Sequence, residues 1–311
     1  MDGWVRPSEG RDGGRLRVRL RTVPHTTTQH IPHHQLPPGF TDSLTRPGAS
    51  PVDPVPAATV ALLKTGGSGL EALLLKRSRR TGFIPGAYVF PGGRVDEEDG
   101  APAILDRIKG ITPEAAQARL AVPGNSPPAL AFFGAAIRET FEETGVLLEK
   151  NALRADAPGN RPHRVTSLPA DILHSHRREL LEGRRTFADV MEERDGELEG
   201  ALTYIGHWVT PHPEPRRYDT RFFAVAVPDH FRVEPDGQEM VEALWLTPHA
   251  ALERNRKGTL PLVFPTLRTL EALAEFRSPA EALAAYKDRE IPRCLPRLTL
   301  TPDGIRIDLD S

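Results

Sequence analysis

The hydrophobic positions that begin near residue 57 follow the pattern of β-strands. Two runs rich in alanine, valine and leucine, residues 57–65 and 70–78, flank the sequence GGSG. Short apolar runs separated by glycines predict a β-hairpin. Strand-like patterns return later in the chain, in the segments ALTYIGHWVTP, TRFFAVAVP and MVEALWLTP.

Helical periodicity is clearest between Pro128 and Thr144, where Phe133, Ile137 and Phe141 recur every four residues. This spacing places the three aromatic and aliphatic side chains on one face of a helix that packs against a core. Further helices are expected in the segments TPEAAQARL, LPADILHSHRRELLEG, TFADVMEER, HAALERNRKG and FPTLRTLEALAEF. Strands and helices in this order predict an α/β sandwich.

The two ends of the chain differ in composition from the part between them. Residues 1–55 are rich in proline, arginine and histidine and poor in large apolar residues, so we expect a disordered tail there. One folded domain is expected over residues 56–285, followed by a polar tail over residues 286–311. Within the domain, segments 100–130 and 150–200 are polar and partly helical, and we interpret both as insertions.

Composition limits the partners that the protein can have. The 311 residues are 39% hydrophobic and carry a formal net charge of -2, which provides a core but no basic surface for nucleic acid. The single cysteine, Cys294, excludes an intramolecular disulfide. No apolar run approaches the ~20 residues that a membrane span needs, and the first residues lack the apolar stretch of a secretory signal. We therefore expect a cytoplasmic protein with no nucleic-acid or membrane partner.

The segment RETFEETG, residues 138–145, carries the strongest chemical signal. Glu139, Glu142 and Glu143 lie on one side of the predicted helix. Because like charges repel, such a cluster is best explained by a divalent cation, and carboxylate oxygens suit Mg²⁺ or Mn²⁺. Arg138 lies four residues before Glu142 and is placed to hold its carboxylate. The alternative interpretation is an ordinary acidic face in contact with water.

Together with the upstream sequence FPGGRVDEED, this segment resembles the signature of the Nudix hydrolases. That signature is a glycine, five residues, an acidic residue, seven residues, Arg-Glu, an apolar residue, any residue, Glu-Glu, any residue and Gly. The matching positions in this chain are Gly93, Arg138, Glu139, Glu142, Glu143 and Gly145, with Val146 at the apolar position that follows.

The chain departs from the signature at three points. Asp99 stands at the acidic position, where the family usually has Glu, and Thr140 stands at the first apolar position. The spacer of seven residues is replaced by residues 100–137, which can be accommodated because loop closure becomes only slowly more costly with length. A long insertion at this point resembles the Nudix type 19 subgroup, as do the sequences GFIPGAYVFPGG, HWVTP, RRYDTRFF and WLTP. The insertion leaves the role of Asp99 open.

The resemblance implies a Nudix-type α/β/α sandwich with a mixed sheet and helical insertions. It also implies that Glu139, Glu142 and Glu143 hold one to three Mg²⁺ or Mn²⁺ ions, and that the carbonyl of Gly92 is a further ligand. Glu139 is alternatively the base that activates water, because family members differ in this respect. Arg138 completes the implied catalytic set.

Family enzymes commonly have one more carboxylate on a loop before a late strand. Glu239, six residues before Trp245, matches that position, and Asp236 and Glu242 are nearby alternatives. An ordinary loop carboxylate is an equally valid interpretation of this residue.

Three residues are candidates for binding the substrate. Arg77 and Arg221 have guanidinium groups that pair with phosphate oxygens, and Tyr88 can stack on a base. Most arginines lie on protein surfaces and most aromatic residues pack in cores, so each assignment competes with a structural one. Other arginines with the same potential are Arg79, Arg80, Arg216 and Arg217.

The type 19 resemblance implies a substrate. It predicts hydrolysis of coenzyme A (CoA) or acyl-CoA to phosphoadenosine and phosphopantetheine products. A separate CoA signature is only partly present, because LLLKRS and Gly86 fit it whereas Gly82 occupies the place of its arginine. Alternatives are ADP-ribose or another nucleoside diphosphate derivative, and a non-catalytic Nudix fold that binds a ligand. A homodimer is also compatible with the resemblance.

Overall fold

The structure is a computed structural model that describes residues 28–33, 52–80, 84–124, 126–150, 170–193, 196–212, 214, 216–229 and 231–309. Most of the segment expected to be a disordered tail, the first part of the second insertion and Gly82 of the partial CoA signature lie outside the described residues.

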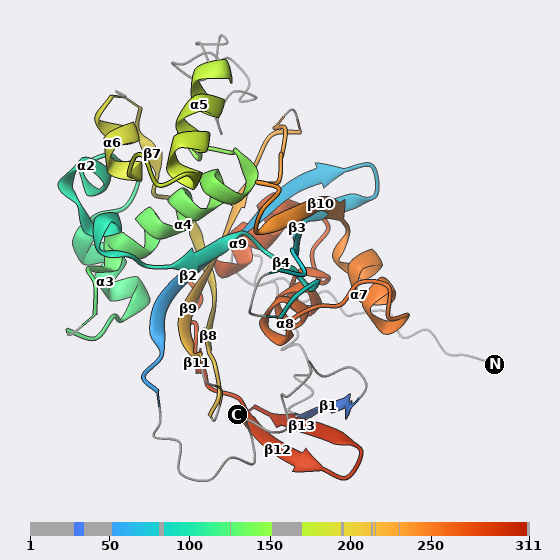
Figure 1. The fold of residues 1–311 in the computed structure, drawn as a ribbon. Helices are drawn as coiled ribbons and strands as arrows, with labels where there is room; N and C mark the ends of the chain where they lie inside the picture. Colours follow the sequence, from blue (N-terminus) through green and yellow to red (C-terminus); the bar gives the residue numbers. More distant parts are fainter. Residues whose placement is uncertain are drawn as a thin grey trace, which may run out of the picture.

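A mixed β-sheet forms the centre of the molecule (Figure 1). Its strands follow the order β10 (Met240–Leu246), β3 (Gly69–Arg77), β2 (Val55–Gly66), β9 (Tyr218–Ala226), β8 (Thr203–Val209) and β11 (Arg293–Cys294). Two short strands extend it, β4 (Tyr88–Val89) beside β3 and β5 (Gly92–Arg94) beside β2. The strands β2 and β9 run parallel, whereas β3 is antiparallel to both β2 and β10. The hairpin predicted from the glycine-rich sequence is therefore confirmed.

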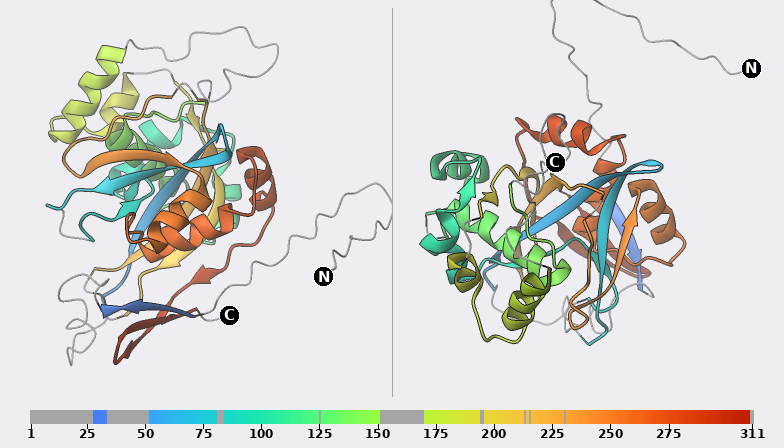
Figure 2. Two further views of the ribbon diagram at one scale, coloured as in Figure 1. Left: turned by 90° about the vertical axis from the view of Figure 1, so that its right-hand side faces the viewer. Right: turned by 90° about the horizontal axis from the view of Figure 1, so that it is seen from above.

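Helices cover both faces of this sheet, as the view from above in Figure 2 shows. The helix α4 (Ala129–Thr144) crosses one face over β2 and β5. The other face is covered by α7 (Pro248–Arg256), α8 (Phe264–Leu273) and α9 (Pro279–Tyr286). Side chains of β3 alternate between the two layers, with Leu73 and Leu75 facing α4 and Leu74 facing the second layer. The predicted α/β sandwich with a mixed sheet is confirmed.

The two insertions lie against each other beside α4. The first contains α2 (Pro102–Leu105), β6 (Ile108–Lys109) and α3 (Pro113–Leu120), after the short 3₁₀ helix η2 (Glu97–Gly100). The second contains α5 (Ala170–Leu181), α6 (Phe187–Glu192) and β7 (Leu198–Glu199). The strands β6 and β7 pair in parallel, and α2 contacts α6. Segments far apart in the sequence thus form one layer next to α4.

A second, three-stranded sheet joins residues from opposite ends of the chain. In it β1 (Thr28–Pro32) pairs with β13 (Gly304–Asp308), which also pairs with β12 (Arg297–Thr301). These strands belong to segments for which the sequence analysis expects tails, and Ile305 and Ile307 of β13 are buried. Among the described residues, no helix has the length and apolar character that crossing a membrane requires.

The approach of α4 to the residues before the first insertion is close enough to require a glycine. A β-carbon added at Gly134 would lie 2.8 Å from the carbonyl oxygen of Asp99 and 3.2 Å from Cγ2 of Ile104. Backbone atoms at such a distance cannot give way without moving η2 or α4. The glycine therefore brings η2 against the helix one turn before Arg138.

We expect the substitution Gly134→Ala to lower the free energy of unfolding by roughly 1–3 kcal/mol, because overpacking outweighs the better helix propensity of alanine. Urea denaturation measures the change. The matched control is Gly124→Ala, since an added β-carbon there meets nothing within 4 Å. Equal effects of the two substitutions would contradict a tight approach of α4 to η2.

Candidate active site

The guanidinium of Arg138 on α4 connects the parts of the candidate site. Its Nε and Nη2 donate to the two carboxylate oxygens of Asp99 at 2.9 and 3.0 Å. Its Nη1 donates to Glu139 at 3.0 Å and to Glu142 at 3.1 Å, and Nη2 also donates to the carbonyl of Arg94 at 3.0 Å. Arg138 is 3% exposed and Asp99 is fully buried. The predicted contact between Arg138 and Glu142 is present.

The position of Asp99 explains how the signature tolerates a long insertion. Its carboxylate accepts a hydrogen bond from the backbone amide of Asp96 at 2.8 Å, within the turn of η2. The same carboxylate forms the bidentate pair with Arg138. The stretch that replaces the seven-residue spacer, residues 100–137, begins directly after one partner of this pair and ends directly before the other. The ion pair closes the base of the insertion, so its length need not disturb the site.

Glu139 and Glu143 face the glycine pair of β5. Oε2 of Glu143 accepts a hydrogen bond from the backbone amide of Gly92 at 2.9 Å, so the contact of this glycine is made through its N–H group. A β-carbon at Gly93 would lie 2.2 Å from Oε1 of Glu139, so any side chain there would occupy the place of the carboxylate. The sequence FPGG is therefore what allows the helix carboxylates to approach the strand.

Burial in this cluster stabilises the neutral forms of the carboxyl groups. Burial raises the pKa of Glu139 to about 7, against the opposing charge of Arg138. Burial also raises the pKa of Glu142, and burial together with the charge of Glu139 raises the pKa of Glu143 well above its ordinary value. For Arg138 burial alone would lower the pKa, but the hydrogen bonds to Asp99 and the nearby carboxylates raise it. One arginine thus faces more acidic groups than it can neutralise.

Two further predicted residues lie near Glu143. The charge of Arg77 lowers the pKa of Glu143 and the charge of Glu239 raises it, so both are close enough to act on this carboxylate. Glu239 lies on the loop before β10, where the carboxylate of Asp236 accepts the backbone amides of residues 238–240 at 2.6, 2.6 and 3.0 Å. Asp236 therefore shapes the loop, and Glu239 is an exposed carboxylate on it.

The donor set fits a divalent cation in its chemistry. Carboxylate oxygens in partly desolvated surroundings suit hard cations such as Mg²⁺, and Glu139, Glu142, Glu143 and Glu239 supply them. In the structure Glu139 and Glu142 are turned towards Arg138. No three His, Cys, Asp or Glu side chains in the described ranges converge closely enough to enclose a metal ion. In this structure Glu139 and Glu142 are thus ion-paired with Arg138.

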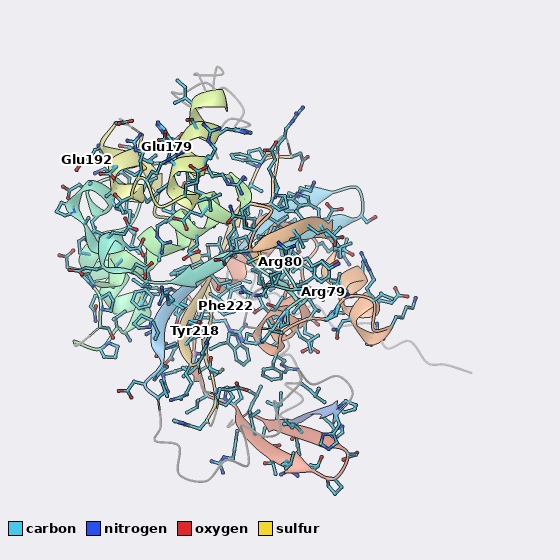
Figure 3. All side chains as sticks on the ribbon, in the orientation of Figure 1. Arg79, Arg80, Glu179, Glu192, Tyr218 and Phe222 are labelled. Carbon is cyan, nitrogen blue, oxygen red and sulfur yellow. The ribbon has the colours of Figure 1, made fainter. Side chains whose placement is uncertain are left out.

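Arg221 and Tyr88 are not brought together with the helix carboxylates. Arg221, on β9, is 3% exposed, pairs with Asp219, and lies 5.0 Å from the ring of Phe132 in the first turn of α4. The glutamates lie in the last two turns of that helix, so Arg221 lies at its opposite end, and its assignment to the substrate stays a prediction. Figure 3 labels its neighbour Phe222, which packs on the other face of the sheet.

Tyr88 faces the layer formed by α7 and α8. It pairs with Lys76 in the strand register, and its hydroxyl donates to Oε2 of Glu242 at 2.9 Å. Because alternate strand residues point to opposite faces, Tyr88 and Glu242 lie away from α4. The exposed pair Arg79 and Arg80 follows β3 and is labelled in Figure 3.

One contact at the site was not expected from the sequence. Nε of Arg177, on α5, donates to the carbonyl oxygen of Glu142 at 2.9 Å. Its guanidinium also covers Gly145, where an added β-carbon would lie 3.2 Å from Nη1. The only local signal is a basic run, HSHRR, which does not show where α5 docks.

Comparisons with known proteins agree with this geometry. The model of the NUDT19 Nudix domain matches residues 56–273. The acyl-coenzyme A diphosphatase NUDT19 of Gallus gallus is 32% identical over 273 residues, which cover 75% of this chain and 70% of that protein. The protein of the same name from Homo sapiens is 32% identical over 265 residues, covering 76% and 70%. A NUDIX hydrolase structure from Alicyclobacillus acidocaldarius aligns with a TM-score of 0.58 at 29% identity, covering 76% of this chain and 97% of that one.

The substitution Asp99→Ala is expected to destabilise the protein by about 3–5 kcal/mol, because it leaves the buried Arg138 without its bidentate partner. Thermal and urea unfolding measure the loss. Glu97→Ala, an exposed carboxylate in the same turn, serves as the control and should have an effect within experimental error. If the two variants are equally stable, the ion pair does not hold the site.

The metal-free protein is expected to lose stability as the pH rises from about 5 to 8. The pKa of Glu139 is raised from 4.5 to about 7 in the folded protein, so the folded state binds this proton more tightly than the unfolded state does between those values. Unfolding free energy therefore falls across this window by roughly 2–3 kcal/mol. Urea unfolding at several pH values in the presence of a chelator gives the slope of the unfolding free energy against pH. The substitution Glu139→Gln should reduce this slope. An unchanged slope in that variant would contradict the assignment.

Proposed function

Since the chain belongs to the NUDT19 Nudix family of hydrolases, we propose that it cleaves the diphosphate linkage of coenzyme A or acyl-CoA. The products would be a phosphoadenosine and a phosphopantetheine or its acyl derivative. The observation that supports the chemistry is the set of desolvated carboxylates on α4, placed against the FPGG glycines. The names of the relatives support the choice of substrate.

Nudix hydrolases generally use a divalent metal ion, and we propose Mg²⁺ or Mn²⁺ for this protein. Its ligands would be Glu139, Glu142 and Glu143, with Glu239 and the backbone of Gly92 beside them. A bound divalent ion neutralises the diphosphate oxygens and lowers the pKa of a coordinated water. To reach an ion, Glu139 and Glu142 would exchange contacts with Arg138 for contacts with the metal.

The residues of the chain supply the rest of the proposed reaction. Arg138 holds the carboxylates of Glu139 and Glu142 in place until the substrate is bound. In the alternative in which Glu139 is the base and not a metal ligand, it accepts a proton from the attacking water, which suits a carboxyl group whose pKa burial raises to about 7 in the metal-free protein. The charge of Arg77 acts on Glu143, which supports the proposal that this guanidinium pairs with a phosphate oxygen.

Product analysis tests the proposal. The purified protein is incubated with CoA, ADP-ribose, NADH or dinucleoside polyphosphates in the presence of Mg²⁺ or Mn²⁺. We expect adenosine 3′,5′-bisphosphate and phosphopantetheine from CoA. The variants Glu142→Gln and Glu143→Gln should lower kcat/KM by about 100-fold or more, a loss of about 2.7 kcal/mol in transition-state stabilisation.

Glu253→Gln, on α7 at the other face of the sheet, is the matched control and should retain the activity. Cleavage of ADP-ribose in preference to CoA would overturn the proposed substrate but would agree with the proposed enzyme class. A protein that binds these nucleotides but hydrolyses none of them would instead be a ligand-binding member of the family.

A further inference from the structure

A groove of about 220 Å³ lies between α5 and the loop that precedes β10. Figure 1 shows this loop beside α5, above the end of α4. The groove is lined by His174, Arg177, Arg178 and Leu181 from the helix, by Glu182 directly after it, and by Asp236 and Gln238 from the loop. One wall thus comes from the second insertion and the other from the loop that carries Glu239.

Both walls are attached to the last turn of α4. On one side Nε of Arg177 donates to the carbonyl of Glu142 at 2.9 Å. On the other side the backbone amide of Glu234 donates to the carbonyl of Thr144 at 2.9 Å. The charges of Asp236, Glu234 and Glu143 also act on Arg177, so the groove adjoins the carboxylate cluster as well as the acidic residues of its own loop.

The acidic groups at the groove already have partners, whereas its arginines have donors to spare. Asp236 accepts three backbone amides of its own turn, and Glu182 at the rim pairs with Arg184. Nη2 of Arg177 is buried and has no hydrogen-bond partner among the described residues. Arg178 is exposed and forms no ion pair with any residue that the structure describes. A partly desolvated guanidinium with free N–H groups favours an oxyanion.

We propose that this groove binds a phosphate group of the substrate other than the two of the diphosphate that is cleaved. The inference rests on the proposed function, and with CoA as substrate the group is the phosphate on the 3′ oxygen of the ribose. That phosphate is separated from the diphosphate by one ribose, which matches a groove beside the carboxylates. Arg177 and Arg178 donate to it, so α5 selects nucleotides that carry it.

The kinetic test compares CoA with dephospho-CoA, which lacks only the 3′ phosphate. The wild-type protein should prefer CoA in kcat/KM by about tenfold or more. Arg178→Ala should raise KM for CoA by about tenfold and leave kcat and the reaction of dephospho-CoA nearly unchanged. Arg177→Lys, which keeps the charge but loses the fork of donors, should have an intermediate effect.

Arg256→Ala on α7 is the matched control, because it removes an exposed arginine from the opposite face of the sheet. Hydrolysis of CoA and dephospho-CoA with equal kcat/KM would leave the proposed function standing and overturn the groove assignment. An equal loss on both substrates in Arg178→Ala would overturn it too.

A binding measurement decides the inference even where no CoA is hydrolysed. Calorimetry with adenosine 3′,5′-bisphosphate and AMP should show about tenfold tighter binding of the bisphosphate by the wild-type protein. Arg178→Ala should remove this preference, and Arg256→Ala should keep it. Equal affinity of the wild-type protein for the two nucleotides would contradict a phosphate site in the groove.

Discussion

The buried guanidinium of Arg138 has to satisfy its donors inside the protein, and this requirement organises the site. A charged group removed from water is tolerated only when it is paired and hydrogen-bonded. Asp99 provides two parallel hydrogen bonds on one side, and the carboxylates of Glu139 and Glu142 provide the others. Because these partners come from η2 and α4, and the carbonyl of Arg94 ends β5, one side chain fixes the mutual position of three elements.

The same ion pair separates the insertions from the chemistry. The chain between Asp99 and Arg138 starts and ends at this ion pair. The length of the first insertion can therefore change without moving the carboxylates. Its strand β6 then pairs with β7 of the second insertion, and the buried residues of both segments belong to the same core as those of β2, β3 and α4. Arg177 of α5, in the second insertion, contacts the last turn of α4. The insertions therefore border the site and leave its framework intact.

Local patterns predicted much of this architecture. The periodicity of α4, the hairpin of β2 and β3 and the spacing of the acidic residues are properties of short segments, and these predictions agree with the structure. Which face a strand residue occupies is harder to predict, because β9 is buried on both sides and shows no alternation between polar and apolar residues. Arg221 lies under the opposite end of α4 and Tyr88 belongs to the second layer, so neither is near the helix carboxylates, and their assignment to the substrate stays a prediction. The contact of Arg177 with Glu142 depends on how α5 docks, which no local pattern encodes.

The small sheet formed by β1, β13 and β12 constrains the order of events during synthesis. Thr28 and Asp308 are hydrogen-bonded although 280 positions separate them. During synthesis β1 is made before β13 and has to wait for this partner until the residues between the two strands have been added. The strands of the main sheet, by contrast, all precede β12 and β13 in the sequence. Closure of the small sheet therefore has to follow synthesis of the 280 positions that separate Thr28 from Asp308.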